Sequence, residues 1–368
     1  MNLPDHIAGL PVTELHFSLR PRHAGRLPPF LGPTLRGAFG HALRQSACPL
    51  QCQPGEVPGA PECFHAGLCA YATLFDPPHP PGSESPARPY VLLPPPGSAG
   101  AHTMVDPSVP LVFGVRLFGP ALRHLTAVIG AVARVGRLGL GAPDFEAESD
   151  PATRESLAVE TVRRLARPRH EADRAEANAM VERLVAWESG RLSFDLEAVT
   201  DARGETVWSL GGPPPALPVA FTLGDADPPP ASDQIRVRFV TPLRLEFGKR
   251  LERHPTARTL VRATLLRLES LSRAFFGESH GISVRSLLDA ASTIATIDER
   301  LSTTAQLERY STHQRQNVPL DGVLGHLDLR GEALREVAWV LRLAEVLHLG
   351  SDTVQGLGRL ELEPIEDR

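Results

Sequence analysis

Four cysteines crowd into one short stretch of the sequence, and the rest of the chain has none. Cysteines that form disulfides in a secreted protein are usually spread along the chain, so this grouping indicates one local site. Four thiolates can hold a zinc ion tetrahedrally, although the C-x3-C-x10-C-x5-C spacing lacks the C-x2-C pairs of standard zinc ribbons. We therefore predict a structural zinc ion, with free cysteines as the alternative. The predicted ligands are Cys48, Cys52, Cys63 and Cys69.

Basic side chains form a second pattern. Almost all of them are arginine, and Lys249 is the only lysine. The net charge of -5 argues against a protein that coats nucleic acid indiscriminately, so any phosphate-binding surface must be local. Residues 236–273 form the most basic stretch and are the predicted backbone-binding surface, although charged side chains on solvated faces are the simpler explanation. The candidates here are Arg238, Arg244, Lys249, Arg250 and Arg253.

Two glycine-rich segments each follow an expected helix and lead into an expected strand, at residues 136–141 and 350–358. Glycines let a backbone approach phosphate closely and offer amide donors to it, so Gly350, Gly356 and Gly358 are candidate nucleic-acid contacts. A structural turn between helix and strand is the alternative. The glycines of residues 136–141 are expected to serve packing between the two halves.

Periodic hydrophobic patterns predict the same order of elements twice along the chain. The first half has strands expected at 12–20, 109–118 and 192–198 and helices at 32–45 and 121–135. The second half has strands at 235–247 and 359–362 and helices at 256–276 and 334–347. This order indicates an internal duplication of a split βαβ unit. We therefore predict an α+β fold of two tandem ferredoxin-like (RRM-like) domains, with two unrelated α+β domains as the alternative.

The expected boundaries follow from this repeat. Residues 1–212 form the N-terminal domain, which carries the cysteine-rich loop at 48–69 and a charged helical insertion at about 146–188. A Pro/Gly-rich linker covers 213–234, and residues 235–368 form the C-terminal domain with its glycine-rich loop at 350–358. The Pro-rich residues 77–96 are expected to be irregular and exposed, with a short strand at 90–92. The chain has no apolar run of roughly 20 residues and no signal-like start, so we expect a soluble, cytoplasmic protein.

Several of these segments resemble a known family. LRGAFGHALR at 35–44, CAYATLFDP at 69–77 and VIGAVARVGRLGLG at 128–141 are similar to the CRISPR-associated pre-crRNA-processing endoribonucleases of the RAMP superfamily. RYSTHQRQNVPLDGVLGHLDLRG at 309–331 and LAEVLHLGSDTVQGLGRLEL at 343–362 resemble that family's C-terminal signature. The resemblance covers most of the chain except the insertion. It implies two ferredoxin-like domains that bind a CRISPR repeat and cut it once to give a mature guide RNA (crRNA).

The resemblance also implies a chemistry and its residues. Cleavage of this type uses the 2′-hydroxyl beside the scissile phosphate, leaves a 2′,3′-cyclic phosphate, and needs a general base, a proton donor and positive charge but no catalytic metal. Relatives carry a histidine in or after the first helix, which selects His41, with His65 as the second candidate and as an alternative zinc ligand. His41 could instead be structural, with cleavage by arginine and tyrosine alone. Tyr310 and His313 are further catalytic candidates, and Arg36, Arg309 and Arg315 further RNA contacts.

The implied partners are precursor crRNA, crRNA and subunits of a CRISPR interference complex, with no membrane and no cofactor for catalysis. One competing function is a non-cleaving RNA-binding subunit of such a complex, because sister proteins keep the fold and lose the cut. Another is a metal-stabilised interaction module without any RNA role.

Overall fold

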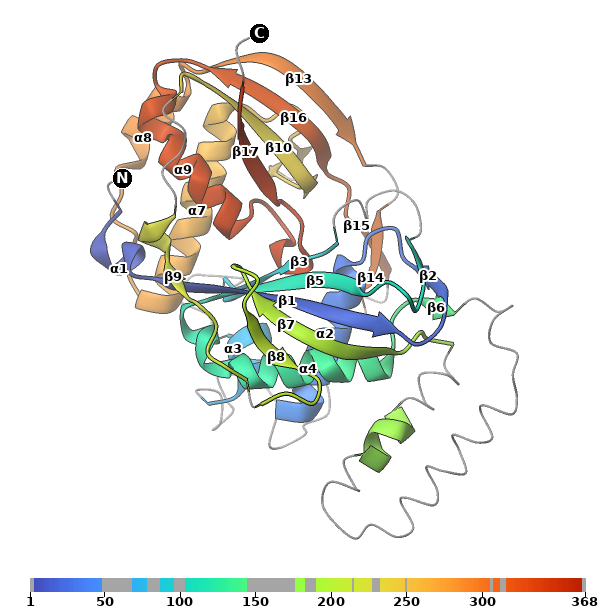
Figure 1. The fold of residues 1–368 in the computed structure, drawn as a ribbon. Helices are drawn as coiled ribbons and strands as arrows, with labels where there is room; N and C mark the ends of the chain where they lie inside the picture. Colours follow the sequence, from blue (N-terminus) through green and yellow to red (C-terminus); the bar gives the residue numbers. More distant parts are fainter. Residues whose placement is uncertain are drawn as a thin grey trace.

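A computed structural model describes residues 3–47, 68–77, 87–95, 103–143, 176–182, 190–213, 215–226, 232–248, 250–304, 307–311 and 316–365. Two antiparallel sheets dominate this part of the chain, one from each half of the sequence (Figure 1). The predicted α+β class is confirmed.

The N-terminal sheet is built around a long central strand. Strand β1 alternates buried Leu15, Phe17 and Leu19 with partly exposed residues, as the periodicity predicts. The sheet order is β3-β5-β1-β7-β8, and β9 pairs with the start of β1. The strands are β1 (Pro11–Pro21), β3 (Tyr90–Leu93), β5 (Leu111–Phe118), β7 (Phe194–Asp201), β8 (Thr206–Ser209) and β9 (Phe221–Thr222).

The helices of this half cover one face of its sheet. Their buried side chains share a single hydrophobic core with β1, β3, β5 and β7. They are α2 (Gly32–Ala47), α3 (Ala70–Phe75), η2 (Gly119–His124) and α4 (Leu125–Leu138), and a short helix α1 (Asp5–Ala8) precedes β1. Residues 176–182 of the predicted insertion are helical, and Glu182 pairs with Arg134 and Arg137 of α4 at 2.8 Å each.

The C-terminal half repeats this arrangement. Its sheet has the order β13-β16-β10-β17, and α7, α8 and α9 share a core with it. The elements are β10 (Gln234–Leu243), α7 (Ala257–Phe276), α8 (Val284–Ala291), β13 (Ala295–Thr303), β16 (Val323–Arg330), α9 (Leu334–Leu347), η4 (Thr353–Gln355) and β17 (Leu360–Pro364).

The two sheets have the same topology. In each half the four main strands, taken in chain order, lie in the spatial order second, third, first, fourth, and a helix follows the first and the third strand. This is the split βαβ arrangement of ferredoxin-like units, so the structure confirms the predicted fold in both halves. The predicted domain boundaries remain a prediction.

A third hydrophobic cluster joins the halves. Leu268 of α7 and Leu343 of α9 pack with Val12 and Phe118, on the face of the N-terminal sheet opposite α2 and α4 (Figure 1). Arg116 of β5 fixes this contact, because its Nη1 donates to the carbonyl oxygens of Glu345 and Val346 at 2.8 and 2.6 Å, at the end of α9. The C-terminal helices are therefore held between the two sheets.

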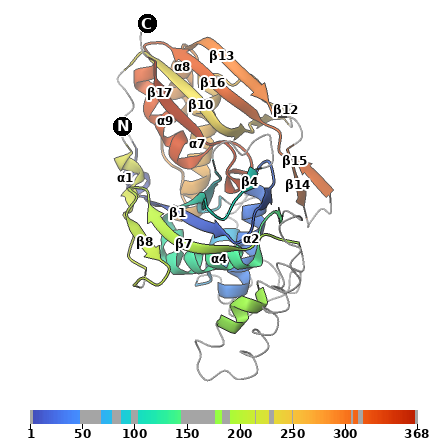
Figure 2. The same cartoon turned by 45° about the vertical axis from the view of Figure 1, so that its right-hand side comes forward.

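Two small sheets and a hairpin lie at one end of the molecule (Figures 1 and 2). Strands β4 (Thr103–Val105), β2 (Gly25–Leu27) and β6 (Ala142–Pro143) form one sheet, β11 (Glu246–Phe247) pairs with β12 (Arg250–Leu251), and β14 (Glu308–Ser311) pairs with β15 (Gln316–Pro319). Phe30, just before α2, packs with Leu320 and Leu357 and with the partly buried Leu307. The base of the β14–β15 hairpin is therefore anchored beside α2.

Two segments expected to be irregular contain ordered elements. The short strand expected at 90–92 within the Pro-rich residues 77–96 is confirmed as β3, but it is buried and not exposed, because β3 packs against both hydrophobic clusters of the N-terminal sheet. The predicted linker contains β9 and η3 (Leu223–Asp225), and Leu223 is buried against α1 and β1.

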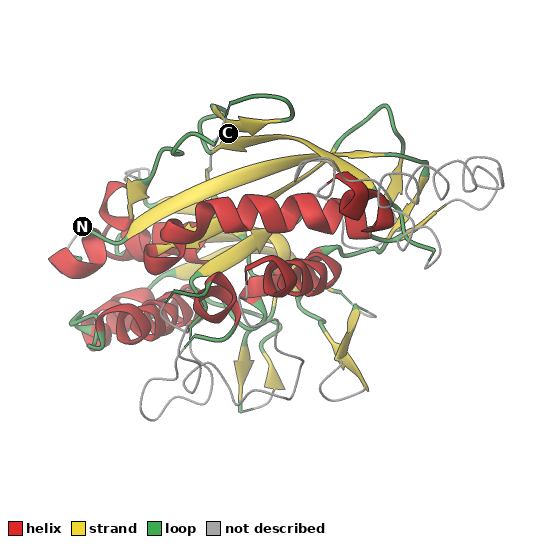
Figure 3. Ribbon diagram, turned by 90° about the horizontal axis from the view of Figure 1, so that it is seen from below, coloured by secondary structure: helices red, strands yellow, loops and turns green. Residues whose placement is uncertain are grey.

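Among the described helices none is long and apolar enough to cross a membrane. Figure 3 shows the helices against their sheets from below.

Candidate active site

A pocket of about 750 Å³ opens on the outer side of α2. Four of its lining residues, Thr34, Gly37, Ala38 and His41, follow the i, i+3, i+4, i+7 spacing of one helix face. The opposite face of α2 carries the buried Leu35, Phe39 and Leu43. The remaining lining residues are Arg26, Pro28, Leu138, Gly139, Leu140, Gly141 and Arg191.

Small residues on the same face of α2 leave open space in front of the His41 side chain. A Cβ atom added at Gly37 would meet nothing within 4 Å, so the helix surface in front of the imidazole is open. The Nε2 atom of His41 lies 2.9 Å from Nε2 of Gln45, one turn farther along the helix. The predicted catalytic histidine therefore faces a pocket and is not a buried structural residue.

The charges around this pocket are of one sign. Burial lowers the pKa of His41, and the positive charges of Arg134, Arg191 and Arg44 lower it further. None of the lining residues is acidic, and neither Arg26 nor Arg191 has an ion pair with any residue that the structure describes. The site therefore offers a neutral imidazole at pH 7 beside two guanidinium groups, which suits proton transfer next to a phosphate.

A glycine turn after α4 brings these groups together. Gly139 and Gly141 have φ values of +83° and +64°, which favour glycine. A Cβ at Gly141 would lie 2.4 Å from the carbonyl oxygen of Arg26, and one at Gly139 would lie 2.8 Å from Cβ of Arg191. The expectation that the glycines of residues 136–141 pack between the two halves is therefore wrong, because their close contacts lie within the N-terminal half.

Sequence reasoning did not single out Arg26 or Arg191. Arg26 lies in the three-residue strand β2 and Arg191 lies next to the isolated bridge of Leu192 with Leu140, and both elements are too short to show a hydrophobic period. The one available signal was the pair of glycines at 139 and 141, because a glycine without a Cβ atom lets other backbone approach closely.

The C-terminal glycine-rich loop contacts the N-terminal half. A Cβ at Gly356 would lie 2.3 Å from Cδ of Pro94, and one at Gly32, the first residue of α2, would lie 1.8 Å from the carbonyl oxygen of Gln355. The amides of Gly356 and Gly358 donate to carbonyl oxygens within the protein, those of Thr353 and Pro242, at 2.9 Å each. The geometry therefore favours the structural alternative for these two amides, and the loop supports the helix that carries His41.

Two arginines of the predicted RNA-binding surface are neutralised by acidic side chains. Arg238 pairs with Glu361 and Glu363, and Arg244 pairs with Asp321 and Glu246. Glu361 and Glu363 face Arg238 because they lie on β17, which pairs with β10, whereas Glu246 and Asp321 lie outside β16 and β17.

The other predicted arginines differ in exposure. Arg250 and Arg253 are exposed without an ion pair to the described residues. The guanidinium of Arg36 lies over the ring of Phe75, 5.6 Å from its centroid, and points into the protein instead of toward solvent.

Several other predicted site residues lie outside the part of the chain that the structure describes. Lys249, His65, His313, Arg315, Cys48, Cys52 and Cys63 lie outside the described residues, and only the backbone of Arg309 and Tyr310 is described, in β14. Cys69 is buried just before α3. The zinc site and the roles of Tyr310 and His313 therefore remain predictions.

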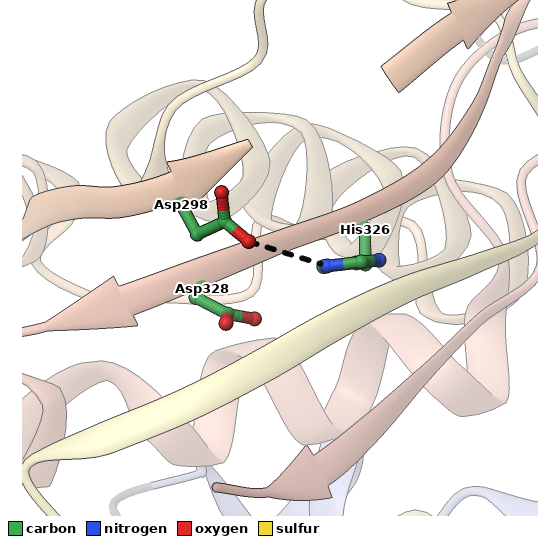
Figure 4. A group of neighbouring side chains, drawn as sticks. All are labelled: Asp298, His326 and Asp328. Atoms are coloured by element: carbon green, nitrogen blue, oxygen red, sulfur yellow. Dashed lines mark ion pairs between the residues drawn. The ribbon is translucent and has the colours of Figure 1, made fainter. Parts of the chain in front are cut away.

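A second cluster of chemically active side chains lies on the C-terminal sheet. Asp298 of β13 and His326 and Asp328 of β16 place one potential metal-ligand atom each within 4.8 Å of one another (Figure 4). Arginines already engage both carboxylates: Arg236 donates to both oxygens of Asp328 at 2.7 and 2.8 Å, and Nε of Arg300 lies 3.2 Å from Asp298. We interpret the cluster as an ion network that joins β13 to β16.

Comparisons with known proteins agree with the geometry. The family model described as CRISPR-associated endoribonuclease Cas6 matches residues 237–360, and a model described as an N-terminal domain matches residues 10–182. A search of curated proteins gives no match.

Solved structures share the fold over almost the whole chain. A partial Cas6-RT-Cas1–Cas2 complex is 13% identical with a TM-score of 0.50, and the match covers 99% of this chain and 47% of that one. A Cas6-RT-Cas1–Cas2 complex gives the same identity, TM-score and coverage of this chain, and 29% of that chain. This chain thus spans less than half the length of both. Cas6 of Thermus thermophilus is 14% identical with a TM-score of 0.47, covering 97% of this chain and 100% of that one.

The Cas6 family match lies in the C-terminal half, where the specific sequence signature was found, and the shared fold extends over both halves. This chain is therefore similar to the CRISPR-associated endoribonuclease Cas6 in the sequence of residues 237–360 and to Cas6-containing structures in fold, in agreement with the resemblance predicted from its sequence.

Proposed function

We propose that this protein binds CRISPR repeat RNA and cuts precursor crRNA at the pocket of His41. The observation that carries the proposal is a neutral histidine in a pocket without acidic lining, beside Arg26 and Arg191. The Cas6 family match supports RNA processing as the task. Precursor crRNA and crRNA are the proposed ligands, and subunits of a CRISPR complex are proposed partners.

The proposed mechanism needs RNA and no catalytic metal ion. His41 takes the proton of the 2′-hydroxyl, whose oxygen attacks the adjacent phosphorus. The bond from phosphorus to the 5′-oxygen breaks, giving a 2′,3′-cyclic phosphate and a 5′-hydroxyl once that oxygen gains a proton. Arg26 and Arg191 stabilise the charge that develops on the phosphate oxygens. Tyr310, in β14 of the hairpin anchored next to α2, and His313 are the proposed proton donors.

The test uses purified protein in EDTA with the repeat RNA of its own array. We expect one cut, a cyclic phosphate end, and no cut when the nucleotide before the scissile bond is 2′-deoxy. Because His41 acts as a base with a lowered pKa, the rate should fall as pH drops below that pKa and stay level above it. Cleavage that requires added divalent metal would overturn the mechanism.

The alternative is a non-cleaving RNA-binding subunit. One observation favours it: Gln45, at Nε2, is the only hydrogen-bond partner of His41 among the described residues, so no described side chain holds the Nδ1 atom of the imidazole. Tight binding of the intact repeat without any cut, with or without metal, would support this alternative.

A further inference from the structure

Two arginines of α4 share one carboxylate that comes from the insertion. Nη2 of Arg134 lies 2.8 Å from Oε1 of Glu182, and Nε of Arg137 donates to Oε2 of Glu182 at 2.8 Å. Each carboxylate oxygen is therefore held by a different guanidinium group. Ala177, in the same helical segment as Glu182, is fully buried, so packing and charge together hold this segment in place.

The arginine pair lies beside the pocket of His41. Leu138, which lines that pocket, follows Arg137 directly and lies one helical turn after Arg134, so residues 134 and 138 share one face of α4. Arg137 also lines a second pocket, of about 320 Å³, whose wall includes Trp208. The pair therefore lies between two pockets, and one of them holds the proposed site of cleavage.

The charges at this position suit a phosphate group. Two guanidinium groups and one carboxylate leave one positive charge uncompensated. Nε of Arg134 is closed off from solvent and has no hydrogen-bond partner among the described residues, so the carboxylate does not use every donor of the pair. A phosphodiester carries the same charge as a carboxylate and likewise offers two oxygens to arginine.

We propose that Arg134 and Arg137 bind a phosphodiester group of the RNA next to the cut, and that Glu182 occupies this position in the free protein. The exchange replaces one anion with another, so the partly buried arginines keep a partner in both states. The second pocket leaves room for the RNA strand beyond this phosphate. This inference rests on RNA binding as the proposed function, and it makes Glu182 an internal competitor of RNA.

Removing the competitor is the first test. The probe is repeat RNA of the protein's own array that is 2′-deoxy at the cut, so that binding is measured without cleavage. E182Q should bind it about tenfold more tightly than wild type, because no charge-assisted hydrogen bonds to the carboxylate have to break first. E361Q is the matched control, since Glu361 pairs with Arg238 on the C-terminal sheet and its loss should leave the affinity unchanged.

Removing the arginines is the second test. R134M and R137M should each bind the same RNA about tenfold more weakly, because each loses a charge-assisted contact with the phosphate. The gain from E182Q should vanish in the R134M/R137M background, because the three side chains act as one unit. E182Q that gains equally in both backgrounds would show that its effect does not pass through the arginines, which contradicts the site.

A scan along the RNA identifies the phosphate. A methylphosphonate, which replaces one charged oxygen with a methyl group, is placed at one linkage at a time around the cut. One linkage should weaken binding to wild type, cancel the gain of E182Q, and have no effect on R134M/R137M. If the arginine variants do not fold, the scan on wild type and E182Q decides alone.

Two failures are distinguishable. Wild type that binds and cuts its repeat RNA, with E182Q binding no tighter or with no linkage that cancels the gain, would overturn this inference and leave the proposed function intact. Wild type and all variants that bind the repeat RNA no better than an unrelated RNA would overturn both.

Discussion

The pocket of His41 and the C-terminal sheet both carry arginines, but they differ in what faces those arginines. On the sheet, Arg236 and Arg238 meet acidic side chains of the neighbouring strands. In the pocket, Arg26 and Arg191 have no acidic partner among the described residues. A paired arginine contributes little to the potential that attracts RNA, so counter-charge and not arginine density marks the candidate site.

The largest expected effect is on the rate of RNA cleavage, which we assign to the pocket of His41 and not to the C-terminal half. H41A should slow single-turnover cleavage of repeat RNA by about 10² to 10⁴-fold, as loss of a general base does, while RNA affinity changes little. H254A is the control, because His254 is an exposed histidine of the C-terminal half paired with Glu299. Equal rates for H41A and wild type would assign the chemistry to other residues.

Removing one arginine from each region sharpens the comparison. R26A or R191A should lower the cleavage rate by about 10²-fold, because each supplies charge to the transition state. Each should also reduce the slope of log affinity against log salt by about 1. R238A should leave rate and slope near wild type. A larger loss in R238A than in R26A would reverse the assignment.

The support of α2 by the glycine-rich loop predicts a stability effect. G32A should cost about 1–3 kcal/mol of unfolding free energy, because the new methyl group would collide with the backbone of Gln355. G130A is the matched helical control: its methyl group meets nothing within 4 Å, so it should stabilise the protein by about 0.5–1 kcal/mol. Urea denaturation measures both, and equal midpoints would contradict the contact.

The smallest effect concerns pH. His348 has a pKa lowered by burial, so below pH 6.5 the unfolded chain binds a proton that the folded protein does not. Stability should therefore be complete above pH 6.5 and fall on acidification, by at most about 1.4 kcal/mol per pH unit for this group. H348N should flatten that slope, since asparagine tolerates the φ of +57° found there. An unchanged slope in H348N would show that other groups cause it.

Much of the fold could be predicted because burial imposes regular periods. The alternation in β1 and the helical spacing in α9 follow directly from one buried face each, and residues 334–347 match α9 residue for residue. Strand β3 shows no alternation because both of its faces are buried, so a short strand was predicted at 90–92 but its burial was not. Strand β13 was not singled out because most of its residues are exposed.

The site was less predictable than the fold. The family resemblance selected His41, but Arg26 and Arg191 reach the pocket through a tertiary contact at Gly139 and Gly141. The pairing of Arg238 with Glu361 and Glu363 also depends on strand order, which a linear charge count does not contain.

The most direct test of the central claim maps where the scissile nucleotide lies. Repeat RNA that is 2′-deoxy at the cut and carries a photoreactive base beside it is bound, irradiated and analysed by mass spectrometry. We predict cross-links to peptides that contain Arg26, His41 or Arg191. Cross-links confined to β10, β16 and β17, with none in those peptides, would contradict the account.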